Sequence, residues 1–317
     1  MLKFILAIAK LYKSFSRIFV MVKVTFLGTS AQIPTVRRNH TSMLLNYDGE
    51  NILVDCGEGT QRQFRKARLN PCRVTRILIT HWHNDHVLGL PGLLSTLALS
   101  GYNKKLFIYG PRGIKKHLDD MFAAFPFVIN YDFEVKEVSG KFLDEKDFYL
   151  EAASMTHGVP CNAYTFVKKG LLRVDKKKLA KSKLPEGPLL QKIKEGKNVT
   201  HKGKKYLAKN LTYKEEDKKV SFVLDTSMND NIVPLVKDSD LLICESCFDE
   251  ELKEKAAEYK HLTTTQIGNI AKKSKSKKLI LAHLSQRYEK DKKKILGEVG
   301  KLFKNVTIAD DLDGVEA

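Results

Sequence analysis

Residues 75–86, TRILITHWHNDH, place three histidines and one aspartate directly behind a short apolar run. The run at 75–80 predicts a buried strand, and the apolar spacing of residues 86–100 predicts a helix. The polar cluster therefore falls where a strand turns into a helix, a common place for functional side chains in layered α/β folds. So dense a cluster of histidine and aspartate is hard to explain by packing alone.

The spacing within this cluster favours a site for two metals. Side chains in extended backbone alternate between two faces, so His81 and His83 are expected to point to the same side. Asp85 and His86 come after the turn, at the start of the expected helix. Two imidazoles and a separate carboxylate–imidazole pair cannot easily all reach one tetrahedral ion, but they suit two adjacent ions.

The chain contains three more candidates for the same site, all later in the sequence. His157 follows a strand-like run in SMTHGVP, Asp225 ends the apolar run in FVLDTS, and His283 ends the run in LILAHLS. Polar residues at strand ends gather at one edge of a layered sheet. Taken singly, each is better explained as a cap or a satisfied core residue. Together with the cluster at 80–86 they favour a metal site.

Strand-like runs alternate with helical stretches over most of the chain after Met21. Expected strands are 23–28, 42–47, 50–56, 75–80, 105–110, 127–138, 147–155, 163–168, 220–226, 240–246 and 277–283, and expected helices are 59–68, 86–100, 111–122, 229–237, 249–259, 263–274 and 288–303. This pattern predicts an α/β fold, either two β-rich halves with helices outside or an αββα sandwich.

The composition is that of a globular protein with excess positive charge. The 317 residues include 55 Lys or Arg against 37 Asp or Glu, a formal charge of +18, and 43% are hydrophobic, which excludes general disorder. The charge favours a polyanionic partner, although lysine-rich surfaces also occur in proteins from hot environments. No apolar run reaches the roughly 18 residues of a membrane span. Five scattered cysteines indicate a reduced, cytoplasmic protein.

Three segments stand apart from the alternating pattern. Residues 1–20 are apolar and basic, which suits a membrane-surface helix or, as we favour, a start codon placed upstream of a natural start at Met21. Residues 168–220 hold 18 Lys or Arg against six acidic residues, and they are expected to be an insertion, either an arm or a disordered charged loop. Residues 311–317 are expected to form an acidic tail behind a domain spanning 21–310.

The motifs resemble the metallo-β-lactamase superfamily and, more closely, ribonuclease Z. The matching pieces are FLGTSAQIPT (26–35), DCGEGTQRQ (55–63), THWHNDHVLGLPGLL (80–94), YGPRGI (109–114), GPLLQKIKEG (187–196), DTS (225–227), HLTTTQ (261–266) and AHLSQRY (282–288). They run in the family's order and span nearly all of the chain after Met21. The resemblance implies an αββα sandwich with an inserted basic arm, and a cytoplasmic endonuclease that removes 3′ trailers from precursor tRNA.

The resemblance also implies two zinc ions per chain and assigns their ligands. The assigned ligands are His81, His83 and His157 for one zinc, Asp85, His86 and His283 for the other, and Asp225 as the bridge between them. Zinc is a reasonable ion for a histidine-rich site with carboxylate support. Asp55 is expected to orient a ligand histidine, to cap a strand-to-helix turn, or to do both.

The implied reaction is attack of a metal-bound hydroxide on a phosphodiester, which leaves a 3′-hydroxyl on the tRNA and a 5′-phosphate on the trailer. The resemblance places a proton donor at His261, oriented by Glu245. A carboxylate neighbour keeps an imidazole protonated more readily, which suits a general acid. Asp85 is expected to share in proton transfer beside its metal role. From the residues alone, Glu245 and His261 are ordinary polar side chains.

Contacts to RNA are expected at two places. In the family, an arm that contains Gly187-Pro188 grips tRNA away from the cut, within a homodimer. Lys192 and Lys194 lie in the matching segment, and such phosphate contacts would make affinity fall with salt. Arg287 lies four residues after a ligand histidine, where its planar guanidinium suits phosphate oxygens. Each of these cations could also belong to a solvated surface.

One loop departs from the family pattern, and several residues are set aside. Bacterial members often carry P-x-K-x-R-N where this chain has Val36 at the lysine position, so the cut position relative to the CCA end stays open. The residues set aside, because they lack partners at ligand spacing or a second cysteine pair, are His40, His117, His201, Cys244 and Cys247.

Two other functions are compatible with these residues. A small-molecule phosphodiesterase or arylsulfatase-like hydrolase on the same fold would use the same metals, since a fold does not decide the substrate. The basic insertion argues against it, because a small substrate needs no such arm. A non-catalytic RNA-binding protein is the third reading, and the complete ligand set argues against it.

Overall fold

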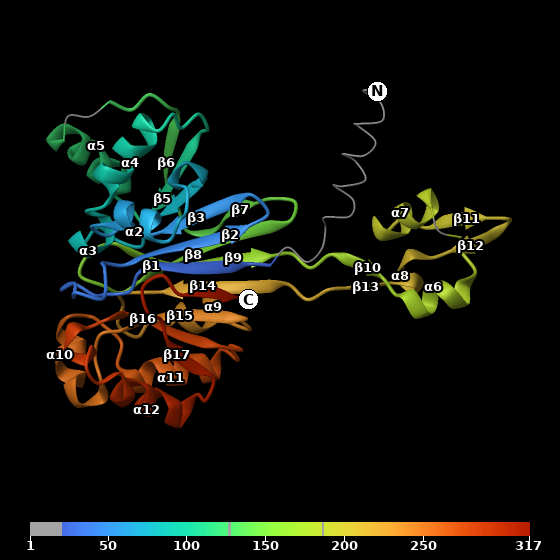
Figure 1. Cartoon of the computed structure of the whole chain (residues 1–317). Coiled ribbons are helices and arrows are strands. Elements are labelled where there is room, and N and C mark those ends of the chain that lie inside the picture. The colour runs from blue at the N-terminus through green and yellow to red at the C-terminus, as the bar shows by residue number, and fades with distance from the viewer. Residues whose placement is uncertain (1–20, 126–127, 186) are drawn as a thin grey trace. The chain divides into compact units, whose positions relative to one another are not determined.

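Two seven-stranded sheets form the frame of the chain in the computed structural model, which describes residues 21–125, 128–185 and 187–317 (Figure 1). The extension discussed above, residues 1–20, lies outside the described residues. The chain divides into two compact units. The larger unit takes in the chain up to Leu143 together with residues 150–166 and 219–317, and the smaller one comprises 144–149 and 167–218.

The first sheet has the strand order β18-β1-β2-β3-β4-β5-β6. Its strands are β1 (Lys23–Gly28), β2 (Ser42–Tyr47), β3 (Glu50–Val54), β4 (Arg76–Leu78), β5 (Leu106–Gly110), β6 (Phe133–Glu137) and β18 (Gly314–Glu316). The pairs from β3 to β6 are parallel, whereas β1 pairs antiparallel with β2 and β18.

The second sheet has the strand order β17-β16-β15-β14-β9-β8-β7. Its strands are β7 (Gly140–Asp144), β8 (Phe148–Met155), β9 (Cys161–Lys168), β14 (Lys218–Val223), β15 (Leu241–Ser246), β16 (Leu279–Leu284) and β17 (Val306–Ile308). Strands β14 to β17 run parallel to one another. Parallel strands are usually covered on both faces, which explains why residues 241–246 and 279–284 are buried throughout.

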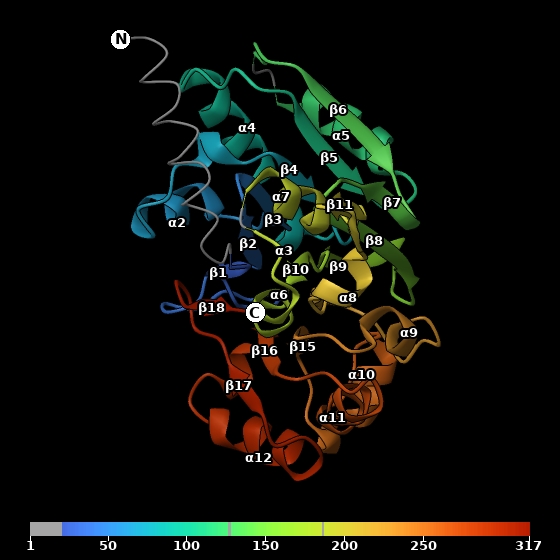
Figure 2. The same cartoon turned by 90° about the vertical axis from the view of Figure 1, so that its right-hand side faces the viewer.

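Helices cover the outer face of each sheet of the larger unit (Figures 1 and 2). The first sheet carries α2 (Thr60–Lys66), the 3-10 turn η1 (Pro71–Arg73), α3 (Asn84–Val87), α4 (Leu90–Leu99) and α5 (Ile114–Ala124). The helices on the side of the second sheet are α9 (Ile232–Val236), η2 (Glu250–Leu252), α10 (Lys253–Glu258), α11 (Thr264–Lys273), η3 (Gln286–Tyr288) and α12 (Lys292–Leu302).

Side chains of the two sheets meet in a shared core. The rings of Tyr47 on β2 and Phe166 on β9 lie 5.5 Å apart, edge to face. The buried Tyr164 hydroxyl, also from β9, donates a 2.7 Å hydrogen bond to the carbonyl of Ile79 directly after β4. Helix, sheet, sheet and helix thus follow one another, and the predicted αββα sandwich is confirmed.

The apolar helix expected at 86–100 is two helices instead of one. Helix α3 ends at Val87 and α4 begins at Leu90, with Leu88 and Gly89 between them. A side chain at Gly89 would collide with the carbonyl oxygen of Gly57, only 2.1 Å from the position of its first carbon. This close approach holds the loop before α2 against the turn that carries Asp85 and His86.

The last residues of the chain differ from the expected acidic tail. Gly314–Glu316 form strand β18, which pairs with β1 and extends the first sheet. Before it, Asp311 accepts hydrogen bonds from the Thr29 hydroxyl and the Asn39 backbone, both at 2.7 Å. The fully buried Arg38 forms ion pairs with Glu289 and Asp310. These contacts join residues that are more than 250 positions apart, which local sequence patterns do not reveal.

The smaller unit is folded around a core of its own. It contains β10 (Leu172–Val174), α6 (Lys176–Ser182), α7 (Pro188–Lys194), β11 (Val199–His201), β12 (Lys204–Tyr206), α8 (Ala208–Leu211) and β13 (Thr212–Lys214). The buried core residues are Leu184, Ile193, Val199, Tyr206, Ala208 and Leu211. Strands β10 and β13 pair antiparallel, with Leu172 opposite Lys214. Of the two sequence alternatives for the insertion, the structure therefore has the folded one.

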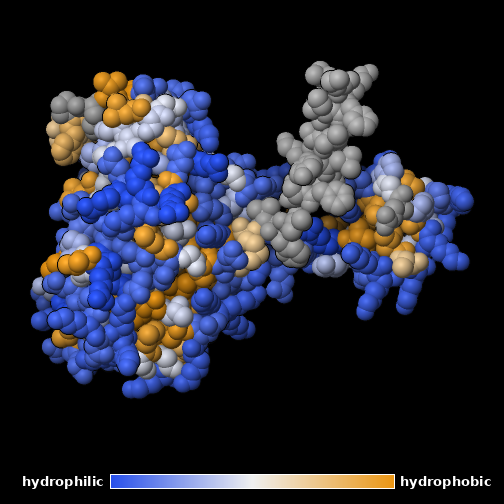
Figure 3. Space-filling view, in the orientation of Figure 1, coloured by the Kyte–Doolittle hydropathy of each residue, from blue (hydrophilic) through white to orange (hydrophobic). Residues whose placement is uncertain are grey.

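Hydrophilic side chains cover much of the visible surface of each unit, as Figure 3 shows. Among the described residues, no helix combines the length and the apolar character needed to cross a membrane.

Candidate metal centre

Three imidazoles converge at the carboxyl ends of the strands of the larger unit. The Nε2 atom of His81 lies 2.9 Å from Nδ1 of His83, and Nε2 of His157 lies 3.2 Å from the same nitrogen. Together with a carboxylate oxygen of Asp225, their ligand atoms all fall within 4.8 Å of one another. His81 and His83 do lie on one side, as the strand spacing predicts, and His157 reaches them from the loop after β8.

A second cluster lies beside the first. Ligand atoms of Asp85, His86 and His283 also fall within 4.8 Å of one another, and all three side chains are buried. Asp225 faces both clusters. Its Oδ1 lies 3.0 Å from Nε2 of His283, and its Oδ2 lies 3.8 Å from Nε2 of His81. The position of Asp225 therefore suits a bridge between two ions.

Buried oxygens hold two of these rings from behind. Asp55 Oδ2 lies 2.6 Å from Nδ1 of His86 and accepts a 2.7 Å bond from the Thr80 hydroxyl. The Thr41 hydroxyl donates to the carbonyl of Ser30 and lies 2.6 Å from Nδ1 of His283. Because that hydroxyl has only one hydrogen, His283 must donate through Nδ1, which leaves its Nε2 free to bind an ion.

His81 and His157 also have an oxygen partner at Nδ1. Nδ1 of His81 lies 3.1 Å from the Thr80 hydroxyl, and Nδ1 of His157 lies 3.1 Å from the carbonyl oxygen of Lys260. Hydrogen bonds of this kind set which ring nitrogen carries the proton. Asp55 is a residue that the sequence predicts in this role, whereas Thr41 and Thr80 are indistinguishable in the sequence from ordinary strand-end threonines.

Two buried atoms without hydrogen-bond partners indicate that a metal fits this arrangement. Among the described side chains, His86 Nε2 and Asp225 Oδ1 are buried without a hydrogen-bond partner, and they lie 3.5 Å apart. An imidazole lone pair facing a carboxylate oxygen leaves both acceptors unsatisfied, and buried polar groups rarely stay so. A cation between them satisfies both. A set of histidine nitrogens and carboxylates therefore fits a bound transition metal.

The charges around the site favour a cation as well. Burial alone would lower the pKa of His86, but Asp85, Asp225 and Asp55 outweigh it and raise that pKa well above its ordinary value. Burial would raise the pKa of Asp225, but His283, His86 and His261 hold it well below the usual range. Asp225 and its neighbours thus attract positive charge into this buried space, which either a proton on His86 or, in its place, a metal ion can supply.

Two backbone positions at the site adopt left-handed conformations without being glycine. Asp55 has φ of 56° and His283 has φ of 50°. Such conformations are costly for residues with side chains and tend to persist at functional sites, where the surroundings hold them. At both positions they turn the side chain from a strand end toward the metal ligands.

A second pair of polar residues lies next to the metal ligands. Nδ1 of His261 lies 2.6 Å from Oε2 of Glu245, and the other oxygen of this fully buried carboxylate accepts from the backbone of Thr226 at 3.0 Å. His261 Nε2 lies 3.8 Å from Asp225. Burial alone would lower the pKa of His261, but Glu245, Cys247 and Asp225 together outweigh it and raise this pKa above its ordinary value. The structure thus brings together the two residues expected to act in proton transfer.

The local sequence around His261 sets its position. Helix α11 begins directly after it with a capping box, in which Thr263 accepts from the Gln266 backbone and the Gln266 side chain accepts from the Thr263 backbone. This arrangement satisfies two otherwise unpaired backbone donors at the helix start. It also holds the chain at residues 261–263 in one conformation.

Five of the seven candidate ligands line a cleft of about 640 Å³, namely His83, Asp85, His157, Asp225 and His283. Its other walls include Phe248, Tyr259, Lys255 and Arg287. The Arg287 guanidinium lies 5.1 Å from the centre of the Phe248 ring and donates to the carbonyl of Cys247 at 3.4 Å. The expected phosphate-binding arginine is therefore in the cleft, although its guanidinium also has protein partners.

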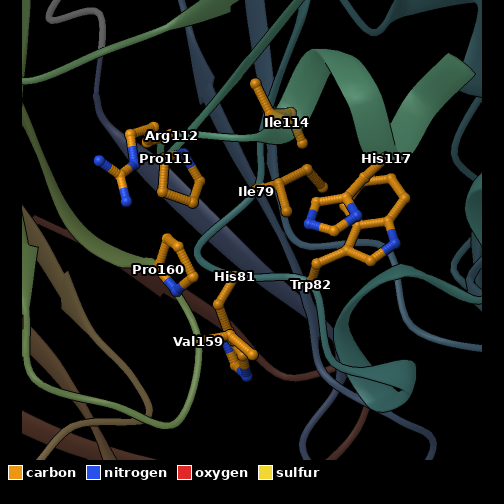
Figure 4. Close-up of a pocket in the computed structure, with 9 residues that line it drawn as sticks. All are labelled: Ile79, His81, Trp82, Pro111, Arg112, Ile114, His117, Val159 and Pro160. Atoms are coloured by element: carbon orange, nitrogen blue, oxygen red, sulfur yellow. The ribbon is translucent and has the colours of Figure 1, made fainter.

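A much smaller cavity, about 10 Å³, lies behind the ligand loop and has room for about one water molecule. Figure 4 shows Trp82 and His117 side by side at this cavity, and their rings are stacked 5.1 Å apart at 10°. Trp82 lies between the two ligands His81 and His83. His117, set aside from the metal site by its spacing, therefore supports the loop that carries two ligands.

The predicted RNA-binding residues other than Arg287 lie in the smaller unit. Gly187 precedes α7, Pro188 is its first residue, and Lys192 and Lys194 are exposed in its last turn. Gly187 has φ of 135°, a conformation that glycine adopts without strain. The smaller unit presents these cations on a folded element.

A buried cluster of histidines and carboxylates at one edge of an αββα sandwich defines a metal-dependent enzyme of the metallo-β-lactamase fold. Comparison with known proteins supports this class and narrows it. Two curated ribonucleases Z, from Nanoarchaeum equitans and Methanothermobacter thermautotrophicus, are each 37% identical to this chain. The alignments cover 92% of both chains in the first case, and 93% of this chain and 97% of the relative in the second. The chain belongs to the ribonuclease Z family.

Two further comparisons agree with the fold. The crystal structure of human tRNase Z, short form, superposes with a TM-score of 0.68 at 26% identity, over 92% of this chain and 98% of that one. A family model described as anti-Pycsar protein Apyc1 matches residues 22–123, which contain the first sheet from β1 to β5 and the ligand loop.

Proposed function

We propose that this chain is an endoribonuclease that removes the 3′ trailer of precursor tRNA, with two zinc ions per chain. The observation that carries the proposal is the seven-residue ligand set around two buried, unsatisfied acceptors, found in a chain of the ribonuclease Z family. The tRNA itself is suggested by the name of the human structural relative. Histidine-rich ligation with carboxylate support suits zinc.

In this proposal His81, His83 and His157 would hold one zinc, Asp85, His86 and His283 would hold the other, and Asp225 is placed to serve both. Bound zinc at this centre would lower the pKa of water and offset negative charge on the phosphate that is cleaved. The carboxylate of Asp55 and the hydroxyls of Thr41 and Thr80 keep the imidazoles in the tautomer that binds metal.

His261 donates the proton that the leaving 3′ oxygen of the tRNA requires. Glu245 accepts from its Nδ1, so the proton that can be transferred is the one on Nε2, the ring nitrogen that faces Asp225 in the cleft. The buried carboxylate compensates the charge of the protonated ring. Asp85, beside its metal role, can take part in proton transfer on the other side of the site.

Recognition of the RNA is assigned to both units. Arg287 in the cleft contacts phosphate close to the cut, and the basic α7 region, with Gly187, Pro188, Lys192 and Lys194, contacts tRNA away from it. Such contacts position the RNA without reading its sequence. The chain is proposed to work as a homodimer in the cytoplasm. The five cysteines, all of which lie in the described residues, are free, as a reducing compartment would leave them.

Cleavage of a 3′-extended precursor tRNA by the zinc-loaded protein tests this function. The wild type should make a single cut near the discriminator base, and Asp85→Ala should abolish it while leaving the fold intact by circular dichroism. A small phosphodiester is the comparison substrate. Turnover of the small substrate without any cut in precursor tRNA would instead favour a small-molecule phosphodiesterase.

A further inference from the structure

A third group of metal-binding side chains lies beside the catalytic cleft and shares no residue with the His/Asp centre. Ligand atoms of Glu245, Cys247 and His261 all fall within 4.8 Å of one another. Glu245 belongs to β15, Cys247 follows this strand by one residue, and His261 precedes α11. Cys247 and His261 line the same cleft as the metal ligands, so the group is open to small ions.

The sulfur of Cys247 is what makes this group different. The thiol is free and donates a 3.4 Å hydrogen bond to the carbonyl of His283. The seven residues of the His/Asp centre supply only nitrogen and oxygen. A thiolate together with an imidazole and a carboxylate is a typical ligand set for zinc, and thiolate favours soft ions such as cadmium.

We propose that Glu245, Cys247 and His261 form a third metal site, which takes a soft divalent cation such as Cd²⁺ or excess Zn²⁺ and thereby blocks the proton donor. The site differs from the His/Asp centre in its ligands and in its preference for thiophilic ions.

The exchange of protons for metal leaves the charge of the site unchanged. Before binding, a Glu245 carboxylate, a protonated His261 and a neutral Cys247 thiol sum to zero. On binding, the thiol and the imidazolium each release one proton to solvent, and bonds form from sulfur, nitrogen and oxygen to the cation. The new charges again sum to zero. A partly buried site tolerates such a neutral exchange, whereas it would resist a net change of charge.

The consequence for activity rests on the function proposed above. The 2.6 Å hydrogen bond between Glu245 and His261 orients the proton donor, and a cation held by both residues replaces it. The cation takes the place of the proton on Nδ1, so the proton left on Nε2 belongs to a neutral imidazole. A neutral imidazole is a far weaker acid than an imidazolium, so His261 no longer protonates the leaving oxygen. Soft metals are therefore inhibitors of this chain, acting at a site that is not needed for binding the two zinc ions.

The test is a titration of the zinc-loaded full-length protein with Cd²⁺, followed by the ultraviolet charge-transfer band of a thiolate–cadmium bond. The wild type should show the band and saturate at one equivalent. Cys247→Ser and Cys247→Ala should both lack it. Cys72→Ser is the matched control and should keep it, because Cys72 is the half-exposed cysteine elsewhere in the chain. Cadmium that only replaces zinc at the His/Asp centre gives no thiolate band.

Cleavage assays provide a second readout. Half-inhibition of the Cys247→Ser protein should require at least about tenfold more Cd²⁺ than the wild type, because the thiolate contributes most of the soft-metal preference. A band that persists in Cys247→Ser, or no band in the wild type at saturating Cd²⁺, would overturn the third site. If precursor tRNA is not cut at all, the band still decides the metal site, and the proposed function fails separately.

Discussion

The ligand imidazoles each direct one ring nitrogen toward the metal space, and the opposite nitrogen of His81, His157 and His283 has a fixed oxygen partner. For His283 that partner is Thr41, whose single hydrogen already goes to Ser30. The contact comes from the loop before β2, far from His283 in the sequence. Single hydroxyl and carbonyl groups behind the rings therefore orient these candidate ligands.

Replacing Thr41 by valine tests this at the level of one hydrogen bond. Thr41→Val keeps the shape of the side chain but removes the acceptor of His283 Nδ1, so zinc affinity should fall about tenfold or more. Thr41→Ser keeps the hydroxyl and should bind zinc like the wild type. Competition with a chromophoric chelator measures both affinities. Equal affinities for the valine protein and the wild type would show that the hydroxyl does not orient His283.

His261 should contribute to the rate and not to metal binding. Loss of a general acid costs on the order of 10²–10⁴ in rate, so His261→Ala should lower the single-turnover rate of precursor tRNA cleavage by that factor. Its zinc content should stay at the wild-type level. His201→Ala, in the smaller unit, serves as the control and should not slow cleavage at saturating RNA. A parallel loss of zinc and activity in His261→Ala would make the residue a metal ligand instead.

At the scale of elements, short turns after the strands hold the site together. Asp249 is an example, because its buried carboxylate caps the start of η2 by accepting from the backbone of Leu252 and pairs with Lys294 of α12 at 2.7 Å. Burial would raise the pKa of Asp249, but the bond to Lys294 and other hydrogen bonds outweigh it and lower this pKa. The carboxylate thus links two elements that follow β15 and β16.

The sign of the pH effect follows from the lowered pKa. Asp249 stabilises the fold when ionised, so its contribution is present above the ordinary aspartate pKa of about 4 and is lost as pH falls through the lower folded value. Asp249→Asn should cost about 1–3 kcal/mol of unfolding free energy at pH 7 and less at pH 3. Urea denaturation at both pH values measures this. Asp230→Asn, at an exposed position, should change neither, and an equal loss at both pH values for Asp249→Asn would contradict the ionic contribution.

At the scale of the molecule, the two units carry different parts of the proposed function. All seven candidate metal ligands and the cleft belong to the larger unit, which has its own sheets and core. The excess positive charge is concentrated at 168–220, and most of that segment lies in the smaller unit. Shortening the smaller unit should therefore weaken RNA binding and leave metal binding unchanged.

Joining Leu172 to Lys214 through a two-residue Gly-Ser turn removes most of the smaller unit. The join is geometrically reasonable because these residues are opposite each other in the β10–β13 pair. The shortened protein should keep two zinc ions but bind precursor tRNA more weakly, with a flatter dependence of log affinity on log salt, because fewer phosphates are neutralised. Filter binding at several salt concentrations measures the slope. An unchanged slope would mean that the removed cations do not contact the RNA.

Local patterns in the sequence are enough to predict several strands, the metal-ligand cluster and the fold class. Strands 23–28 and 42–47 have the bounds that their apolar runs predict, because strand periodicity and flanking turn residues are local properties. The cluster at 81–86 was recognisable because ligand spacing in one loop is local as well. The αββα class and the ribonuclease Z family followed from the same motifs taken in order, and both are confirmed.

Only the tertiary structure decided which residues stand behind the ligands and which become neighbours. Thr41 is an ordinary residue before a strand until packing sets it against His283. Cys247 belongs to a cysteine pair without a second pair until the fold brings it beside His261. The C-terminal residues join the first sheet for the same reason. Contacts between distant segments depend on how buried faces pack, and a local pattern of residues does not contain that information.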